Sequence, residues 1–506
     1  MILILFITTF ILSLFCIFTV KKIAYKNNLT NSQQTDRWND SNIALHGGIG
    51  FIPVFLVSSI ILLWFQLDGD FRPILLIDSN SEHSILFGIL AGALLMFVVG
   101  IIDDAINLNS MNKLFFQSIS ASIFLVFTDV IFIHNHPILN IFITYFWFIG
   151  IINAFNLLDN MDGLASGVVI VSLLAAIYFI TNSSLGFDSL SCSIIFILIS
   201  CVGAFWCFNF PPATIFMGDS GSLSLGFLVA AFVAPSPLND YFLPINNNSY
   251  PLYIGTLISF SIAIVPIFDT GFVTITRLWE ARKISQGGKD HTSHRLMNFG
   301  LNERKVIAFF YIYAFIGVVI AILISKYPIF WLPLFIFLLL IISLLGVYIG
   351  RIKTTRNATQ ISNNFPLNNQ IIEAVMDIGL VTVCFYTSYI IRFGGSIADD
   401  LIQIINSSLP IIIGSSLISF QFFGIYKKKW LQISLVDYKS FLQASIGSVI
   451  LSVAFVTLFL QFPDGNSRGV FLIFGLLLFP IMFISRFSLN ILDRFLLKLI
   501  KINTKH

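Results

Sequence analysis

Four short clusters of acidic, amide and histidine side chains interrupt an otherwise apolar chain. The first is the adjacent pair Asp103 and Asp104, which closes an apolar run. Two carboxylates side by side at the end of a membrane helix are costly unless they meet a cation or share a proton. The pair therefore predicts a divalent-metal or titrating site, with a solvated helix end as the alternative. Lys113 follows closely and either offers a charge to a phosphate or anchors the next helix at the headgroups.

The second cluster closes another apolar run, between residues 153 and 163. Asn156 and Asp159 are three residues apart, as are Asp159 and Asp162, so a helix would make them neighbours. Amides and carboxylates gathered in this way suit the edge of a nucleobase and the hydroxyls of a ribose. An EF-hand would need a longer ligand loop than this segment has, so a calcium loop is not expected.

The third cluster is the segment Phe216-Met-Gly-Asp219-Ser-Gly-Ser222. Its two glycines allow backbone N–H groups to approach an anion, and the lone carboxylate of Asp219 can bind a hard metal ion. Phe216 could stack on a base. The alternative is a tight turn in which Asp219 caps a helix.

The fourth cluster lies in the loop 273–305, which is rich in arginine and lysine. It contains Asp290 and His291, followed after two residues by His294 and Arg295. Two histidines three residues apart suggest contacts to a phosphate or a metal ion. A basic loop beside a membrane is more often an anchor for anionic lipids, and the histidines favour the functional reading.

Long apolar runs must position these clusters. The chain has 506 residues, of which 57% are hydrophobic and only 10% charged, too little polar surface for a soluble fold of this length. Runs of about 20 apolar residues recur throughout, which predicts an all-α polytopic membrane protein. About fifteen spans are expected, near 1–20, 49–66, 84–102, 115–133, 138–155, 163–181, 190–207, 223–235, 253–272, 306–324, 328–349, 372–391, 401–425, 441–461 and 469–490.

The distribution of positive charge predicts the orientation of these spans. With the N-terminus outside, the alternate loops beginning with 21–48 hold 23 of the 28 lysines and arginines. Cytoplasmic loops carry such an excess, so an N-out, C-in topology follows. This topology places all four polar clusters on the cytoplasmic side. The net charge of +3 is too small, and its residues too scattered, to suggest nucleic-acid binding.

The order of the four clusters resembles the polyprenyl-phosphate N-acetylhexosamine-1-phosphate transferases of glycosyltransferase family 4, over about residues 1–350. The segment from Asp290 to Leu296 is similar to that of the bacterial branch acting on N-acetylhexosamines, and it differs from the histidine run of the peptidoglycan-precursor branch. The chain departs from the family where relatives carry Pro-Arg-Gly-Gly. Here Leu45-His46-Gly47-Gly48 stands instead, so the basic phosphate contact is expected either to be weaker, with Arg37 as a compensating residue, or to be replaced by His46.

The resemblance implies a role for each cluster. Asp219 would bind Mg²⁺, or Mn²⁺ in its place, with Asp103 and Asp104 as further ligands. Asp103 or Asp104 would deprotonate or position the lipid phosphate, and in-line displacement at phosphorus would release UMP. A two-step route through a phospho-aspartate at Asp219 is the rival mechanism. Residues implied in substrate binding are Gly47, Gly48, Lys113, Asn156, Asp159, Asp162, Phe216, Asp290, His291, His294 and Arg295.

The expected reaction joins a UDP-N-acetylhexosamine to polyprenyl (undecaprenyl) phosphate within membrane lipid. The product would be a lipid-diphosphate-linked sugar that starts a lipopolysaccharide O-antigen or a related cell-wall glycan. The resemblance places the enzyme in the bacterial cytoplasmic (inner) membrane, with its active site on the cytoplasmic face. The sugar and the glycan are left open.

The C-terminal part of the chain is expected to form a separate module. Residues 351–371 break the apolar pattern and are predicted to be a cytoplasmic linker. Residues 372–506 contain about four runs and resemble the membrane portion of bacterial nucleotide-sugar epimerases and dehydratases of the polysaccharide-synthesis type. Only about sixteen residues follow Asn490, too few for a dinucleotide-binding fold. We therefore expect a noncatalytic module that docks an enzyme of the nucleotide-sugar pathway.

Other function classes fit the sequence less well. A transporter of a lipid-linked or nucleotide-sugar substrate is the main alternative, but it should place polar groups near the bilayer midplane in two related halves. An intramembrane aspartyl protease needs a Gly-x-Gly-Asp context, which Met217-Gly218-Asp219 does not supply. A structural scaffold would fit the C-terminal quarter but would not require the acidic clusters.

Overall fold

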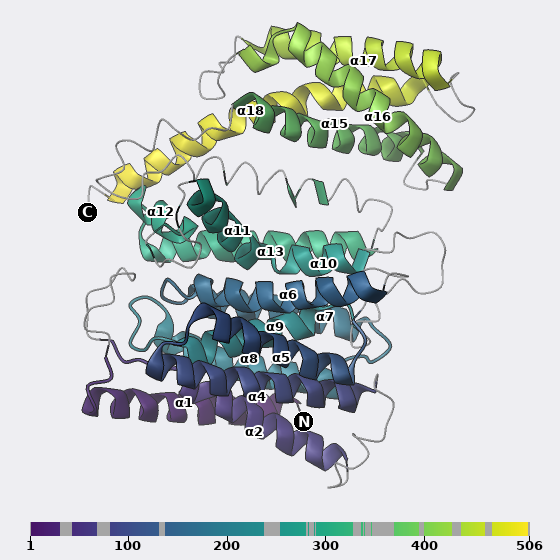
Figure 1. Cartoon of the computed structure of the whole chain (residues 1–506). Helices are drawn as coiled ribbons and strands as arrows, with labels where there is room; N and C mark the ends of the chain where they lie inside the picture. The colour runs from purple at the N-terminus through teal and green to yellow at the C-terminus, as the bar shows by residue number, and fades with distance from the viewer. Residues whose placement is uncertain are drawn as a thin grey trace. The chain divides into compact units, whose positions relative to one another are not determined.

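The structure is a computed structural model of the whole chain, all of whose regular elements are helices in the part described (Figure 1). The described residues are 2–30, 43–67, 81–130, 137–236, 254–279, 282, 288, 290–326, 335–336, 338–339, 346, 369–393, 399–427, 437–460 and 468–503. The helices are α1 (Ile2–Lys26), α2 (Gly48–Gln66), α4 (Glu82–Ile106), α5 (Ser110–Phe127), α6 (Pro137–Leu158), α7 (Leu164–Thr181), α8 (Leu190–Asn209), α9 (Asp219–Val233), α10 (Ile254–Ile262), α11 (Ile264–Trp279), α12 (Thr292–Asn298), α13 (Glu303–Lys326), α15 (Asn369–Phe393), α16 (Asp399–Phe422), α17 (Tyr438–Leu460) and α18 (Arg468–Asn503).

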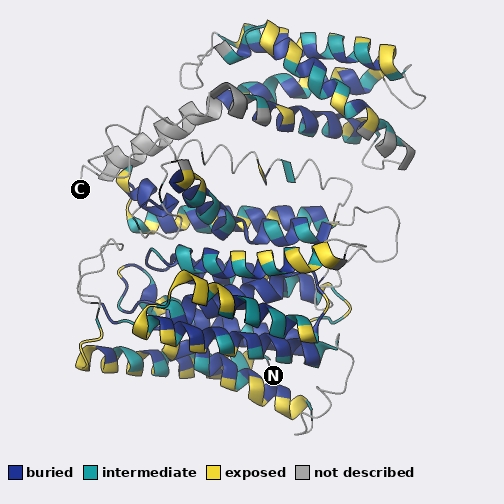
Figure 2. Ribbon diagram, viewed as in Figure 1, coloured by how far each residue is buried: buried dark blue, intermediate teal, exposed yellow. Residues whose placement is uncertain are grey.

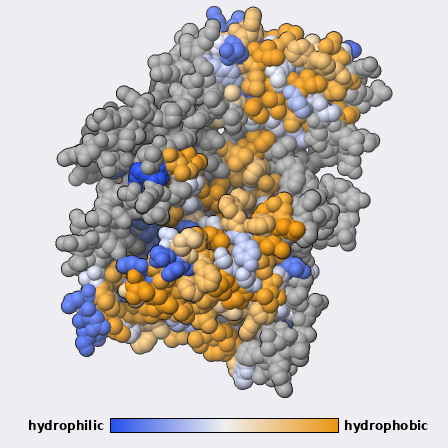
Figure 3. Space-filling model, in the orientation of Figure 1, coloured by the Kyte–Doolittle hydropathy of each residue, from blue (hydrophilic) through white to orange (hydrophobic). Residues whose placement is uncertain are grey.

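The all-α, multi-pass architecture is confirmed. Eleven of the described helices are long and apolar enough to cross a membrane, or twelve if α10 and α11 form one bent span. Large apolar side chains such as Phe15, Phe65, Phe142 and Phe146 are exposed on these helices. Figure 3 shows a largely apolar surface over the described residues, as expected where lipid is the solvent. The orientation of the spans stays a prediction.

Two of the predicted spans take a different form. The run 223–235 belongs to α9, which has 15 residues and is shorter than the other spans. The run 253–272 is broken between α10 and α11, whose axes are bent by 79°. The run 328–349 lies largely outside the described residues.

The chain divides into two compact units, Met1–Ser325 and Lys326–His506. The sequence predicts the domain boundary at residue 350, whereas the structure divides the chain between Ser325 and Lys326. The predicted linker 351–371 lies largely outside the described residues, so its role stays a prediction. All four polar clusters belong to the first unit.

Helix α9 is at the core of the first unit, where it packs against α4 and α6 (Figure 2). Ser220 to Val233 are all buried, because this helix is apolar or small on every face. Two glycines allow the close approach of its neighbours. A Cβ on Gly100 of α4 would strike the backbone of Ser220, and one on Gly226 would lie 2.8 Å from Cα of Ile152 on α6. The end of α4 is thereby fixed against the start of α9.

The second unit contains α15, α16, α17 and α18. Ser415 of α16 and Ser452 of α17 share a buried hydrogen bond of 2.6 Å between their hydroxyl oxygens. Arg486 of α18 donates to Asp377 of α15 over 2.7 Å, and both side chains are buried. A buried ion pair of this kind fixes which helices are neighbours, because separating the partners would leave a charge in apolar surroundings.

Candidate active site

Asp103, Lys113, Asn156 and Asp219 form the first polar cluster of the structure. It lies where the ends of four helices of the first unit meet. Lys113, in the first turn of α5, forms an ion pair with Asp219 at the start of α9, with Nζ 2.9 Å from Oδ2. The same Nζ also contacts Oδ2 of Asp103, near the end of α4. Asn156 of α6 donates from Nδ2 to Oδ1 of Asp219 and to Ser222, both over 2.9 Å. The structure therefore brings together four of the predicted site residues.

Asp103 is held by the turn between α4 and α5. Its Oδ1 accepts a hydrogen bond of 2.7 Å from the backbone N–H of Leu108. The turn passes through Asn107, whose φ of 51° places it in the left-handed region that ends many helices. One carboxylate oxygen thus stabilises the turn, while the other contacts Lys113.

Asp104 makes different contacts from its neighbour. Its two oxygens accept from the backbone N–H groups of Asp219, over 2.7 Å, and of Ser220, over 3.1 Å. These amides open α9 and have no partner within the helix, so a carboxylate is well suited to bind them. Asp104 therefore fixes the position of Asp219. Nδ1 of His46 lies 3.4 Å from Oδ2 of Asp104, so the residue expected to replace a basic contact does face this cluster.

Gly47 and Gly48 pack against the segment before α9. Their N–H groups donate to the carbonyl oxygens of Phe216, over 2.7 Å, and Met217, over 2.8 Å. A Cβ on Gly48 would lie 2.7 Å from the hydroxyl oxygen of Ser220 and closer still to the backbone of Gly221. In this arrangement the two amides bind the protein's own carbonyls, and the glycines serve close packing. Their role in substrate binding stays a prediction.

Phe216 lies in the core of the first unit. Only 1% of its surface is exposed, and it clusters with Ile43 and Ala213. The ring therefore stabilises the segment before α9 in this arrangement. Stacking on a base, which the sequence suggested, would require the ring to leave this cluster.

The acidic residues after α6 are mostly buried. Asp162 accepts a hydrogen bond of 3.0 Å from the backbone N–H of Ala213, and 8% of its surface is exposed. Asn209 accepts from the N–H of Gly163 over 2.9 Å and donates to the carbonyl of Ile215 over 3.0 Å. Asp162 and Asn209 thus hold the two loops together. Asp159 is 9% exposed.

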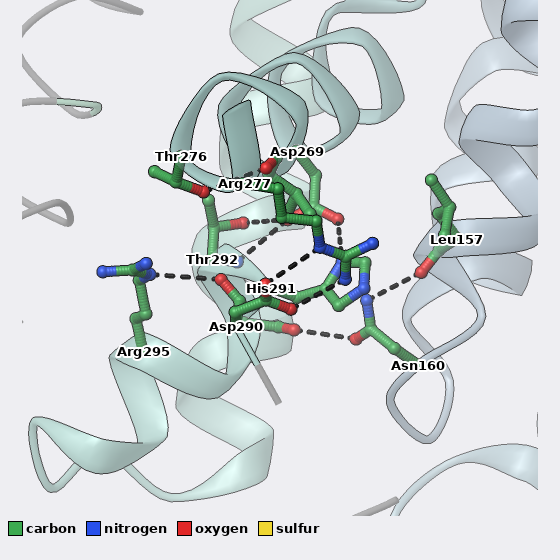
Figure 4. Close-up of polar contacts among 11 residues, drawn as sticks. Leu157, Asn160, Asp269, Thr276, Arg277, Asp290, His291, Thr292 and Arg295 are labelled. Carbon is green, nitrogen blue, oxygen red and sulfur yellow. Dashed lines mark hydrogen bonds and ion pairs between the residues drawn. The ribbon is translucent and has the colours of Figure 1, made fainter. Parts of the chain in front are cut away.

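Asp269, Arg277, Asp290 and His291 form the second polar cluster of the structure. It joins α11 to the segment that starts α12 (Figure 4). Arg277 donates to both oxygens of Asp290, from Nε over 2.9 Å and from Nη2 over 2.8 Å. Nη1 of Arg282 lies 3.2 Å from Oδ2 of Asp290. Burial alone would raise the pKa of Asp290, but the two guanidinium groups and His291 outweigh it and lower the pKa.

The histidines of this cluster have different surroundings. Nδ1 of His291 lies 2.9 Å from Oδ2 of Asp269, a buried carboxylate of α11. His294 is fully buried, and its ring centroid lies 6.2 Å from that of His291. Arg295 donates from Nε to the carbonyl of Asp290 over 3.1 Å and stacks over Phe272. The four predicted residues of this loop therefore belong to one network.

Sequence analysis missed several residues of these networks. Asp269 and Arg277 anchor the histidine loop, and Ser222 shares the amide of Asn156 with Asp219. Asn160 accepts from the hydroxyl of Ser293 over 2.7 Å and so ties the histidine loop to the turn after α6. The available signal was the isolation of Asp269 within an apolar run, because a lone acid there needs a partner.

The residues present fit a hard divalent cation such as Mg²⁺. Within the described part of the chain no group of three or more histidine, cysteine, aspartate or glutamate side chains could hold a metal ion. Asp103 and Asp219, however, converge on one positive charge, the ammonium of Lys113. Mg²⁺ commonly binds through one or two carboxylates together with substrate phosphates. The site therefore suits a metal that arrives with a phosphorylated substrate.

Comparison with known proteins agrees with this geometry. Residues 86–236, which run from within α4 to just beyond α9, match the family described as "Glycosyl transferase family 4". A probable undecaprenyl-phosphate N-acetylglucosaminyl 1-phosphate transferase of Bacillus subtilis is 35% identical over 264 residues, which are 50% of this chain and 70% of the relative.

Two further relatives carry a different sugar in their names. A phospho-N-acetylmuramoyl-pentapeptide-transferase of Streptococcus gordonii is 32% identical over 44% of this chain and 71% of its own length. That of Staphylococcus carnosus is 27% identical over 44% of this chain and 72% of its own length. The chain belongs to glycosyl transferase family 4 and is a multi-pass membrane protein of the polyprenyl-phosphate sugar-1-phosphate transferase type.

Proposed function

We propose that this protein transfers an N-acetylhexosamine 1-phosphate from a UDP-sugar to undecaprenyl phosphate and releases UMP. The observation that carries the proposal is the contact of Lys113 with both Asp103 and Asp219 at the meeting point of four helix ends. Phosphoryl transfer needs mainly positioning and neutralisation of charge, and this cluster offers a cation, two acids and an oriented amide.

The side chains of the cluster divide this work. A lipid phosphate has a second ionisation near pH 6, so it is already a competent nucleophile and needs orientation more than a base. Lys113 supplies positive charge to the phosphates, and Asp103 positions the acceptor. Asn156 and Asp104 hold Asp219, one through its side chain and the other through its backbone. Bound Mg²⁺, held by Asp219 and Asp103, would neutralise the donor diphosphate.

The donor sugar is proposed from two observations. The relative with N-acetylglucosaminyl in its name is 35% identical, whereas the two N-acetylmuramoyl-pentapeptide enzymes are 32% and 27% identical. The segment Asp290 to Leu296 also resembles the branch acting on N-acetylhexosamines. We therefore favour UDP-N-acetylglucosamine or a close relative, and a product that starts a surface glycan such as the O-antigen of lipopolysaccharide.

The proposed location is the bacterial cytoplasmic membrane, with the site on the cytoplasmic face. Lys113 and the basic residues Arg277 and Arg282 lie on the side that the excess of positive charge assigns to the cytoplasm. UDP-sugars are water-soluble, and the acceptor phosphate belongs to a lipid. A site at the ends of α4, α5, α6 and α9 would meet both substrates at the membrane boundary.

The second unit is proposed to dock an enzyme that supplies the nucleotide sugar. The buried pair Arg486 and Asp377 would give its helices a fixed arrangement for such a partner. Removal of residues 372–506 should then abolish association with the partner while purified enzyme activity persists. Unchanged association after this deletion would rule out the docking role.

Product analysis tests the proposed activity. Purified protein is given undecaprenyl phosphate, Mg²⁺ and a panel of UDP-N-acetylhexosamines, and UMP is measured. Asp219→Asn should abolish UMP release, whereas Asp188→Asn, which changes an exposed acid between α7 and α8, should leave it unchanged. Release of UDP would indicate glycosyl transfer, and no nucleotide product with any sugar would favour the transporter.

A further inference from the structure

The buried carboxylate of Asp269 has an unusual set of partners for a residue of an apolar helix. It lies on α11, and only 1% of its side chain is exposed. Oδ1 accepts from the backbone N–H of Thr292 over 3.0 Å and also contacts the hydroxyl of that residue. Oδ2 faces Nδ1 of His291 over 2.9 Å. Three donors on one carboxylate are the arrangement expected of an ionised acid.

These contacts determine which nitrogen of His291 remains for other partners. An ionised carboxylate can only accept hydrogen bonds, so Nδ1 must carry the proton that it donates to Asp269. Nε2 then carries a lone pair and can accept a hydrogen bond from a substrate hydroxyl. A carboxylate that orients a histidine in this way fixes both the tautomer and the plane of the ring.

The histidine segment is also tied to the turn after α6. Ser293 donates to Oδ1 of Asn160 over 2.7 Å, and Asn160 donates from Nδ2 to the carbonyl of Leu157 over 2.8 Å (Figure 4). Asn156, which binds Asp219, lies in the last turn of α6, and Asn160 lies in the turn that follows this helix. The segment that carries His291 is thus bonded to α11 through Asp269 and to the turn after α6 through Asn160.

We infer that Asp269 is a positioning residue that holds His291 with Nδ1 protonated and Nε2 available to the nucleotide-sugar substrate. This inference deepens the proposed function and rests on it for the identity of the substrate. It assigns a role to a residue of the bent segment α10–α11, whose second half carries the carboxylate to the loop. It also separates His291, which would touch substrate, from Asp269, which acts through it.

The experiment combines kinetics with a direct measurement of the tautomer. Full-length protein labelled with ¹⁵N in its histidines is studied by NMR at alkaline pH, where imidazole is neutral, and the signals of His291 are assigned by their loss in His291→Gln. The wild type should show a protonated Nδ1. Asp269→Asn should lose this tautomer, because the amide oxygen would stay with the donors of Thr292 and the NH2 group would then donate to Nδ1. A wild-type ring protonated at Nε2 would overturn the inference without any variant at Asp269.

The kinetic arm distinguishes positioning from mere stability. Asp269→Asn should lower kcat by about 10- to 100-fold with a smaller change in KM. The double variant with His291→Gln should be no slower than His291→Gln alone, because both changes remove the same oriented nitrogen. Thr276→Val, which removes another buried hydroxyl of α11, one that donates to the carbonyl of Val273 in the same helix, is the control. Losses that multiply in the double variant would contradict the inference.

The transferase activity and the positioning role of Asp269 are tested separately. If wild-type protein forms no UMP from any UDP-sugar, the proposed function is wrong, and the tautomer of His291 still decides the role of Asp269. If UMP is formed but Asp269→Asn keeps wild-type kcat, the positioning role is wrong and the transferase remains.

Discussion

Lys113 and Asp219 form an ion pair of 2.9 Å between residues that lie 106 positions apart in the chain. The pair joins the first turn of α5 to the first residue of α9, and Asp103 contacts the same ammonium. The arrangement concentrates opposite charges where α4, α5, α6 and α9 meet. A substrate that brings phosphate groups and a metal ion would find partners of both signs here.

Removal of the positive charge at Lys113 should impair catalysis more than folding. Lys113→Gln is expected to lower kcat by about 100- to 1,000-fold, the usual effect of losing one charge-stabilising donor. Lys22→Gln, at an exposed position of α1, should behave as the wild type. Initial rates of UMP release would measure the effect. A Lys113→Gln enzyme within threefold of the wild type would show that this ammonium does not act on substrate.

The two adjacent acids should differ in their effects on stability. Asp104→Asn replaces one acceptor of the two amides that open α9, so it should destabilise the protein by about 1–3 kcal/mol. Asp103→Asn keeps an acceptor for Leu108 and should reduce activity with a smaller change in Tm. Thermal unfolding in detergent would compare the two. Equal Tm values for Asp104→Asn and wild type would contradict the structural role of Asp104.

Two glycine substitutions form a matched pair. Gly100→Ala would drive a Cβ into the backbone of Ser220 beside Asp219, so overpacking of about 1–3 kcal/mol and a loss of activity are expected. Gly150→Ala, within α6, meets no atom within 4 Å and should be neutral or stabilising. Tm and UMP release would be measured for both. Similar behaviour of the two variants would show that close approach of α4 and α9 is unimportant.

The ion pair of Arg277 with Asp290 should make the free energy of unfolding depend on pH. The pKa of Asp290 is lowered in the folded state, so its contribution is present above the ordinary value of about 3.9 and is lost as pH falls through the lowered pKa. Asp290→Asn leaves the buried Arg277 without its carboxylate and should cost about 3–5 kcal/mol near neutral pH. The difference in Tm between wild type and variant should shrink below about pH 4. A constant difference from pH 7 to pH 3 would contradict this account.

Most of the helices could be predicted from hydrophobic runs. Whether a helix is surrounded by protein or by lipid could not. The run 223–235 is as apolar as the others, yet α9 is a short central helix surrounded by protein. Hydropathy measures how apolar a segment is and does not distinguish burial in protein from burial in lipid. Hydropathy did not reveal the bend of 79° after Ile262, because the residues on both sides remain apolar, although Pro266 in the first turn of α11 was an available signal.

The clusters of site residues were predictable, but the division of roles within them was not. Asp103 and Asp104 are equivalent in sequence, and they differ because successive helix positions point about 100° apart, one toward Lys113 and the other toward the amides of α9. Those amides lie more than a hundred residues away in the chain. Phe216 likewise suited a stacking role by its type, and only the fold shows that its ring is buried.

The central claim is that the β-phosphate of the donor moves with the sugar to the lipid. A UDP-N-acetylhexosamine labelled with ³²P in its β-phosphate tests this claim directly, with undecaprenyl phosphate, Mg²⁺ and the wild-type protein beside Asp219→Asn. We expect the label in the lipid fraction with the wild type, an equal amount of UMP in water, and neither with Asp219→Asn. Label that stays in water as UDP, while sugar enters the lipid, would contradict phosphosugar transfer.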